Sequence, residues 1–317
     1  MYTRDGTGAN RTRVARDPGR FSPVFILTSA RSYSSVICAM LGQHPQLAGL
    51  PELKLFSNAT IRELEEPPPS FWLARGVQHR SPGLVRAIAQ YKFHSQSLDS
   101  LAEAKGWLQA RSEWSGAHIL DSILEEVAPR QAVEKSPENS LTDSALRRLA
   151  RAYPKARYLH LTRHPVTTQR SAQEHWKRIF PGSPQPGEPM AGVSSWVDTH
   201  SRILRFSGSV DGGRYLRVRA EDVLNDLPSQ LVRVAHWLGI REDPDSIGAM
   251  MRPEESPFAR FGPDGSGVIG GNDPGFLRNP SPRKVALPEM VEQPAGWVEN
   301  AFLWKSALDL ALRLGYE

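Results

Sequence analysis

The stretch from Val24 to Gly42 constrains the fold of this chain more than any other part of it. It begins with four apolar residues, 24–27, and such a short run between polar residues predicts a buried strand. A turn rich in hydroxyl groups follows. Apolar residues then recur at helical spacing up to Gly42, which predicts a helix that ends there. This order directs the free N–H groups of the helix start out of the turn, so the sequence predicts an anion site.

The side chains of the turn also suit an anion. Arg31 supplies a charged, planar donor, and the hydroxyl groups of Thr28, Ser29, Ser32 and Ser34 add further donors. An ordinary helix cap would explain the serines but not the cation. The turn differs from the common nucleotide loop, because it has neither the glycines nor the lysine of that motif. It is equally far from the G-x-G-x-x-G fingerprint.

The order of the predicted elements indicates an α/β fold. We expect further strands at 47–50, 132–135, 157–162 and 214–218, and helices at 53–65, 140–153, 165–180, 192–206, 229–239 and 297–314. Strands that alternate with helices imply a mainly parallel sheet flanked by helices on both faces. Ligands of such sheets bind at the carboxyl ends of the strands.

The length of 317 residues fits one α/β domain with a modest insert. We expect residues 1–22 to form a disordered tail and residues 23–317 to form the domain. Within the domain, residues 54–130 predict a helical insert, where we expect acceptor specificity to lie. Residues 252–282 are rich in Gly, Pro, Asp and Asn and predict a lid-like loop.

Composition narrows the class of protein. A net charge of +5 permits an anionic ligand, such as a nucleotide or an acidic carrier protein, but is too mild and scattered to indicate nucleic acid. The mean hydropathy of −0.42 and the lack of a long apolar run argue against a membrane span. The single cysteine, Cys38, excludes internal disulfides, and we expect a cytoplasmic protein. The histidines are scattered, so we expect no metal site.

Residues 28–35 read Thr-Ser-Ala-Arg-Ser-Tyr-Ser-Ser. They resemble the 5′-phosphosulfate loop of sulfotransferases that use 3′-phosphoadenosine-5′-phosphosulfate (PAPS), which implies a P-loop-like sulfotransferase fold. The family commonly has Pro or Gly at the position of Ala30 and Gly at the position of Tyr33. We expect Tyr33 at the helix start, with a negative φ. The resemblance implies cofactor contacts from Thr28, Ser29, Ala30, Arg31, Ser32, Tyr33, Ser34 and Ser35.

A second motif surrounds Arg163, directly after the predicted strand 157–162. It resembles the 3′-phosphate motif of the same family, an Arg at a strand end and a Ser eight residues later, here Ser171. A guanidinium at a strand end can bind a phosphate through two donors. Two anion sites on adjacent strand ends suit a nucleoside with phosphate at both ends. The resemblance therefore implies PAPS as the donor and 3′-phosphoadenosine-5′-phosphate (PAP) as its product.

A third motif, residues 134–137, reads Glu-Lys-Ser-Pro and resembles a segment of carbohydrate and bacterial sulfotransferases. By that resemblance, Lys135 would help to neutralise charge near the transferred group. Sulfuryl transfer to an alcohol needs a base for the hydroxyl proton. In many bacterial members a Glu after the second strand fills this role, and Glu52 is its match. His44 is a competing base.

The sequence thus predicts a PAPS-dependent sulfotransferase that acts on a hydroxyl of a small molecule, free or tethered to an acyl carrier protein. Glycan, lipid and phenolic acceptors stay open, as does the oligomeric state. The loop at Gly270 and Gly271 is expected to fold over the cofactor. A phosphate-loop kinase would need a loop Lys and an Asp after the strand, where Arg163 stands instead. A nucleotide-binding regulator would need no base, so Glu52 separates it from the enzyme.

Overall fold

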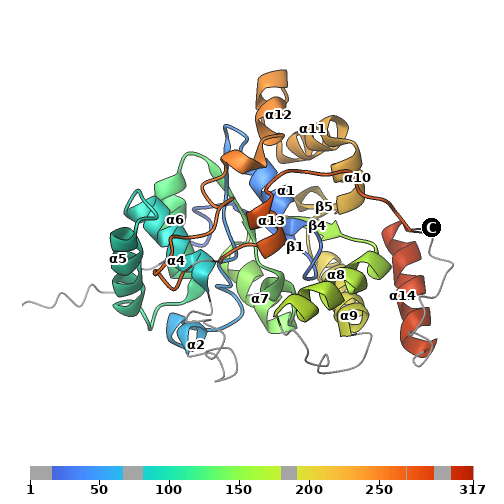
Figure 1. The fold of residues 1–317 in the computed structure, drawn as a ribbon, viewed down its shortest axis with the longest axis horizontal. Helices are drawn as coiled ribbons and strands as arrows, with labels where there is room; N and C mark the ends of the chain where they lie inside the picture. Colours follow the sequence, from blue (N-terminus) through green and yellow to red (C-terminus); the bar gives the residue numbers. More distant parts are fainter. Residues whose placement is uncertain (1–15, 67–80, 180–190, 269, 289–300, 317) are drawn as a thin grey trace, which may run out of the picture.

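The computed structural model describes residues 16–66, 81–179, 191–268, 270–288 and 301–316. Its centre is a five-stranded sheet in the order β2-β3-β1-β4-β5 (Figure 1). The strands are β1 (Val24–Leu27), β2 (Leu47–Gly49), β3 (Gln131–Lys135), β4 (Arg157–Thr162) and β5 (Tyr215–Arg219). Every pair of neighbouring strands is parallel, so the predicted sheet is confirmed.

The register of the sheet places the three predicted motifs side by side. In β1, Val24 lies opposite Val133 of β3 on one side and opposite Arg157 of β4 on the other. The segments that follow β1, β3 and β4 therefore leave the same edge of the sheet. This edge is formed by the carboxyl ends of the strands, where parallel sheets bind their ligands.

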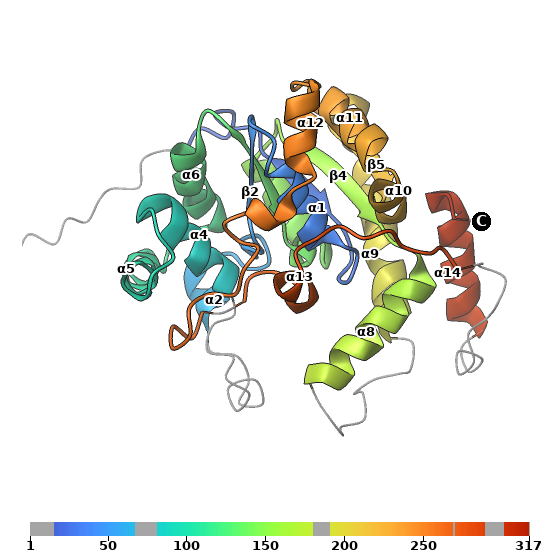
Figure 2. The same ribbon diagram turned by 45° about the horizontal axis from the view of Figure 1, so that its top comes forward.

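Helices cover both faces of the sheet, because the side chains of each strand alternate between two cores. Phe25 and Leu27 pack into one core, and Val24 and Ile26 into the other. The first core includes α4 (Pro82–Lys92), α5 (Leu98–Gln109), α6 (Gly116–Val127) and α7 (Asp143–Ala152). The second includes α1 (Ser34–Leu41), α10 (Ala220–Asn225), α11 (Leu227–Leu238) and α12 (Pro244–Met250) (Figure 2).

A third group of helices packs together beside the sheet. It consists of α8 (Pro165–Ile179), α9 (Ala191–Ser207) and α14 (Ala301–Leu314). Trp196 of α9 is fully buried against Leu310 and Leu314 of α14. Figure 1 shows these helices on the side of the molecule away from α4, α5 and α6. The short helix α13 (Pro274–Arg278) lies between the two groups.

Most of the predicted helices are present, but the helix expected at 53–65 is wrong. The structure has only α2 (Ile61–Glu65), and Lys54 adopts a left-handed φ of 59°. Several backbone groups ahead of α2 bond to side chains elsewhere in the chain. The Leu53 and Lys54 amides donate to the side chains of Glu134 and Ser136, and Arg148 donates to the Phe56 carbonyl. Tertiary bonds thus replace the helical ones.

The prediction that residues 1–22 are disordered is wrong for residues 16–22. Residues 1–15 lie outside the described residues, but residues 16–22 pack against the domain. Arg16 lies over the Tyr153 ring at 4.4 Å and pairs with Asp121 at 2.5 Å. Arg20 pairs with Glu125 at 2.6 Å. The packed domain therefore includes Arg16 and Arg20.

Gly42 ends α1 as predicted, but for a packing reason. Its φ is −66°, so it needs no left-handed backbone. A Cβ at Gly42 would instead lie 2.5 Å from the Cα of Gly49, because α1 rests directly on β2. Within the described part of the chain, no helix is long and apolar enough to cross a membrane. The same residues contain no cluster of three side chains suited to a metal ion.

Candidate active site

A cavity of about 770 Å³ opens at the carboxyl edge of the sheet. Its walls come from the turn after β1, the start of α1, the residue after β4, α8 and the segment around α13. Ligand pockets in proteins typically measure about 300–1,000 Å³. The cavity therefore has the size for a nucleotide-sized ligand, and it lies where the sheet topology places a ligand.

The turn after β1 is shaped by two residues in the left-handed region. Arg31 has a φ of 67° and Tyr33 a φ of 59°. The prediction of a negative φ for Tyr33 is therefore wrong. The left-handed conformation costs a residue with a Cβ about 1–2 kcal/mol. The Tyr33 ring offsets this cost by lying under the Arg163 guanidinium, 4.0 Å from ring centroid to carbon. A glycine is suited to this position because it has no Cβ.

Not all of the predicted loop residues face the cavity. Those that line it are Ala30, Arg31, Ser32, Tyr33, Ser34 and Ser35. Thr28 and Ser29 are buried beneath them and are absent from the lining. Ser29 bonds to the Ser32 hydroxyl at 3.0 Å and to a ring nitrogen of His200 at 3.2 Å. These two residues therefore support the turn from below.

The two predicted anion motifs contact each other in the wall of this cavity. Arg31 donates through Nε to the Ser171 hydroxyl at 3.2 Å and pairs through Nη1 with Asp273. Arg163 donates through Nη1 to the Arg31 carbonyl at 2.6 Å and through Nε to Thr167 at 3.0 Å. The expected neighbourhood of Arg31, Arg163 and Ser171 is thus present.

Asp273 is a site residue that the sequence analysis missed. It caps α13, because its carboxylate accepts from the amides of Gly275 and Phe276 at 2.9 and 3.1 Å. Burial opposes its ionisation, yet Arg31 and the hydrogen bonds lower its pKa below the ordinary value. An Asp before a Pro is a pattern of helix starts, which was the available signal. Its carboxylate holds Arg31 at the place where an anionic ligand would compete for it.

Lys135 lies under the floor of the cavity and is fully buried. Its Nζ donates to a Glu52 carboxylate oxygen at 2.6 Å and to the Ser35 hydroxyl at 2.8 Å. Glu52 lines the cavity, and its side chain is 23% exposed. The structure therefore brings the predicted base, the predicted Lys and the start of α1 into one hydrogen-bonded group.

Gly270 and Gly271 do not line the cavity, so their predicted contact with the cofactor lacks support in the structure. Gly271 has a φ of 108°, and a Cβ there would lie 2.6 Å from the Cα of Gly83. Its carbonyl accepts from the Glu52 amide at 2.8 Å. The Gly270 carbonyl accepts from Arg86 at 2.8 Å. The two glycines fix the loop against α4 and the backbone of Glu52.

His44 is not placed to act as a base in this cavity. It follows the end of α1 and precedes β2, so it lies at the opposite edge of the sheet from the strand ends. Its ring is buried, and Nδ1 accepts from the Gln46 amide at 3.1 Å. Nε2 then carries the proton and bonds to the Arg241 carbonyl at 3.0 Å. Both ring nitrogens are occupied by the fold.

His175 is a second residue that the sequence analysis missed. It lies on α8 one turn after Ser171 and lines the cavity. Burial lowers its pKa below the ordinary value, and Arg31 lowers it further. The ring is therefore neutral at neutral pH and free of any hydrogen bond to the described residues, so it can accept a proton. The spacing of four residues from Ser171 was the signal that could have revealed it.

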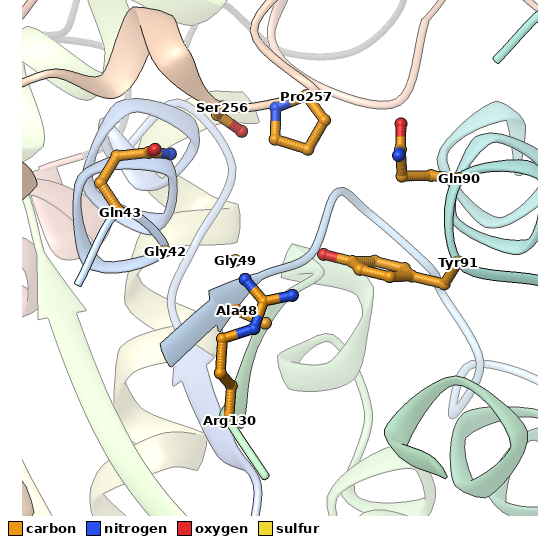
Figure 3. A pocket seen from close by; sticks show the side chains of 9 residues that line it. All are labelled: Gly42, Gln43, Ala48, Gly49, Gln90, Tyr91, Arg130, Ser256 and Pro257. Atoms are coloured by element: carbon orange, nitrogen blue, oxygen red, sulfur yellow. The ribbon is translucent and has the colours of Figure 1, made fainter. Parts of the chain in front are cut away.

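A second, smaller cavity of about 170 Å³ lies between the end of α1, β2 and α4. The Arg130 guanidinium and the Tyr91 hydroxyl point into it (Figure 3). Among the described residues it shares none of its lining with the large cavity, and none of its lining residues belongs to β1 or β4. The large cavity is therefore the candidate active site.

Comparison with known proteins agrees with this geometry. A family model described as the sulfotransferase family matches residues 23–244. The sulfotransferase domain from the curacin biosynthetic pathway has a similar structure, with a TM-score of 0.73, 22% identity, and coverage of 94% of this chain and 99% of that one. For the sulfotransferase domain from the Synechococcus PCC 7002 olefin synthase, these values are 0.69, 24%, 95% and 98%. No curated protein matches the sequence. Because the family model matches well over half of this chain, the chain belongs to the sulfotransferase family.

Proposed function

We propose that this protein transfers a sulfuryl group from PAPS to a hydroxyl of a small acceptor by in-line displacement. The observation that carries the proposal is the convergence of Arg31, Arg163 and Ser171 on one cavity from two adjacent strand ends. Two cationic groups in one cavity suit a ligand with two separate anionic groups. The size of the cavity and the helix start that opens into it fit the same ligand.

Different residues of this chain would hold the two anionic groups of the ligand. The N–H groups at the start of α1, with Arg31 and the turn hydroxyls, would hold the 5′-phosphosulfate. Arg163 and Ser171 would hold the 3′-phosphate. Arg31 would exchange its ion pair with Asp273 for the ligand anion, since both compete for the same guanidinium.

PAPS supplies the sulfuryl group and a phosphate leaving group. Glu52 accepts the proton of the acceptor hydroxyl, because this residue lines the cavity and its side chain is partly exposed. Lys135 orients Glu52 through their hydrogen bond, and with Arg31 it stabilises the negative charge that develops as the S–O bond breaks. Removing one such donor typically lowers turnover by about 10²–10³-fold.

His175 is a second candidate for the base, because it is a proton acceptor without a hydrogen-bond partner among the described residues and lines the same cavity. The variants Glu52→Gln and His175→Asn separate the two roles. Loss of the base lowers turnover by about 10²-fold or more, whereas loss of an acceptor contact raises KM instead.

The acceptor we propose is a hydroxyl compound of a biosynthetic pathway, free or tethered to an acyl carrier protein. The similar sulfotransferase domains come from the curacin pathway and from an olefin synthase, which favours this choice over a glycan. A panel of free and carrier-bound hydroxyl compounds, assayed for PAP release, tests the acceptor class.

Calorimetric titration tests the donor. PAP and adenosine 5′-phosphosulfate are titrated into wild type, Arg163→Ala and Ser171→Ala. A charge-assisted hydrogen bond contributes about 1.5–3 kcal/mol and a neutral one about 0.5–1.5 kcal/mol. Arg163→Ala should therefore weaken PAP about 10- to 100-fold, and Ser171→Ala about 2- to 10-fold.

Affinity for adenosine 5′-phosphosulfate, which lacks the 3′-phosphate, should change little in Arg163→Ala. Arg178 is an exposed Arg on the same helix as Ser171 and is absent from the cavity lining, so Arg178→Ala serves as the matched control. If Arg163→Ala weakened the binding of both nucleotides equally, the role of Arg163 would be to hold the Arg31 carbonyl. The proposal that PAPS is the donor would then lose its main support.

A further inference from the structure

A chain of five hydrogen-bonded side chains runs behind the anion loop. It starts at Tyr215 of β5, whose hydroxyl lies 2.6 Å from Nδ1 of His160. His160 Nε2 lies 2.8 Å from Nδ1 of His200, and His200 Nε2 lies 3.2 Å from the Ser29 hydroxyl. Ser29 in turn lies 3.0 Å from the Ser32 hydroxyl. The chain thus connects the edge strand to the wall of the active-site cavity, which Ser32 lines.

Both imidazoles in this chain are neutral. Each is fully buried. Burial lowers the pKa of His200 to about 3, and burial together with its neighbour His200 holds the pKa of His160 well below its ordinary value. Arg217 of β5 lowers the pKa of His160 further, because its positive charge disfavours a charged imidazole. A neutral imidazole donates at one nitrogen and accepts at the other. A ring that accepts a hydrogen bond at one nitrogen therefore donates one at the other. All hydrogen bonds along the chain must then point in the same direction.

The chain consequently has two possible directions, which differ at Ser32. If Tyr215 donates to His160, each bond points inward, and Ser29 receives a proton from His200. Ser29 can then donate to the Ser32 oxygen, and the Ser32 hydroxyl is able to donate a hydrogen bond to a ligand in the cavity. If the direction is reversed, Ser29 gives its proton to His200 and takes one from Ser32. Ser32 then presents only an oxygen lone pair, which repels an anion.

We infer that the hydrogen bonds of this five-residue chain, here called the relay, are donated inward, from Tyr215 towards Ser32. Tyr215, His160 and His200 are then positioning residues, which make Ser32 a hydrogen-bond donor to the anion in the cavity. A phenol hydroxyl is a better donor than acceptor, and the 2.6 Å distance to His160 Nδ1 fits a strong O–H···N bond. Anions accept hydrogen bonds and donate none. Both ends of the relay therefore favour the same direction.

The inference deepens the proposed function and rests on it only in naming the anion as the 5′-phosphate of PAP. The direction itself can be measured without any nucleotide. The ¹⁵N chemical shifts of the two imidazoles in the free protein at pH 7 distinguish the tautomers. The inward relay requires the proton on Nε2 of both His160 and His200. A proton on Nδ1 of either ring, or a charged ring, overturns the inference.

A double-mutant cycle then tests the consequence for binding. PAP is titrated calorimetrically into wild type, Tyr215→Phe, Ser29→Ala and the double variant. Tyr215→Phe keeps the ring and removes one neutral hydrogen bond outside the cavity, so PAP should bind about 2- to 10-fold more weakly. The relay is already cut in Ser29→Ala. Adding Tyr215→Phe to that variant should therefore cost nothing further.

Tyr91 lies at the small cavity, so Tyr91→Phe is the matched control and should leave PAP affinity unchanged. Additive losses in the cycle, or wild-type affinity in Tyr215→Phe, overturn the positioning role. Failure of wild type to bind PAP would instead refute the proposed function, and the imidazole shifts would still decide the direction of the relay.

Discussion

The ion pair between Glu52 and Lys135 makes a sharp prediction for Glu52→Gln. The Lys135 side chain is 0% exposed, and its hydrogen-bond partners are the Glu52 carboxylate and the Ser35 hydroxyl. The amide of the variant removes the carboxylate that pairs with this buried ammonium. Breaking a buried pair in this way typically costs about 3–5 kcal/mol. Because the Glu52 side chain is 23% exposed and admits some water, we expect a loss of about 2–4 kcal/mol in the free energy of unfolding.

Urea unfolding at pH 7 measures this loss in Glu52→Gln, Lys135→Met and the double variant. Lys135→Met should cost less than Glu52→Gln, since water can reach the remaining carboxylate. The double variant should regain most of the stability, because no unpaired charge remains. All three variants should lose turnover, whereas only the double variant should regain stability. The two measurements therefore separate the effect on folding from the effect on catalysis. Glu113→Gln, in an exposed pair with Arg62, is the matched control and should cost less than about 1 kcal/mol.

Two results would refute the reasoning. In the first, Glu52→Gln unfolds at the same urea concentration as wild type. In the second, the losses of the two single variants simply add in the double variant. Either result would mean that the ammonium of Lys135 is not held by Glu52 in solution.

Three further predictions concern other parts of the site. Tyr33→Ala should be less stable than Tyr33→Gly by about 1 kcal/mol in thermal unfolding, since both lose the contact with Arg163 but only Ala keeps the left-handed strain. Asp273→Asn should strengthen PAP binding about 3- to 30-fold by calorimetry, because Asn retains the helix cap and removes the negative charge that competes for Arg31; weaker binding would contradict this. Burial raises the pKa of Glu134 to about 7, so its native state holds a proton that the unfolded chain has released, and stability falls as pH rises. Wild type should lose about 2 kcal/mol from this group between pH 5 and 7 in urea unfolding, and Glu134→Gln should not.

The parts of the site that the sequence predicted are those governed by local pattern. The turn at Arg31 lies between a short apolar run and a helix of clear periodicity, and Arg163 follows a strand of the same kind. Parallel strands then bring their ends together without further information. His44 illustrates the same rule in reverse. A residue between a helix and the next strand lies at the amino edge of a parallel sheet, so its exclusion from the site was predictable.

The parts that the sequence could not predict depend on contacts between distant residues. The positive φ of Tyr33 is offset by a contact between its ring and Arg163, more than a hundred residues later. Asp273 and His175 enter the site only through the way α13 and α8 face the cavity. The missing helix at 53–65 has the same cause, since its backbone bonds to the side chains of Glu134, Ser136 and Arg148.

The bond from the Glu52 amide to the Gly271 carbonyl has a consequence for the order of synthesis. On a ribosome, the loop that holds the Glu52 backbone emerges more than two hundred residues after Glu52 itself. The Asp273 amide that bonds to Ser35 emerges with it. Contacts between such distant positions form late, because the intervening chain must first be ordered. In a nascent chain the backbone of Glu52 and the Ser35 hydroxyl therefore lack these two partners until residues 271–273 have been made and have docked.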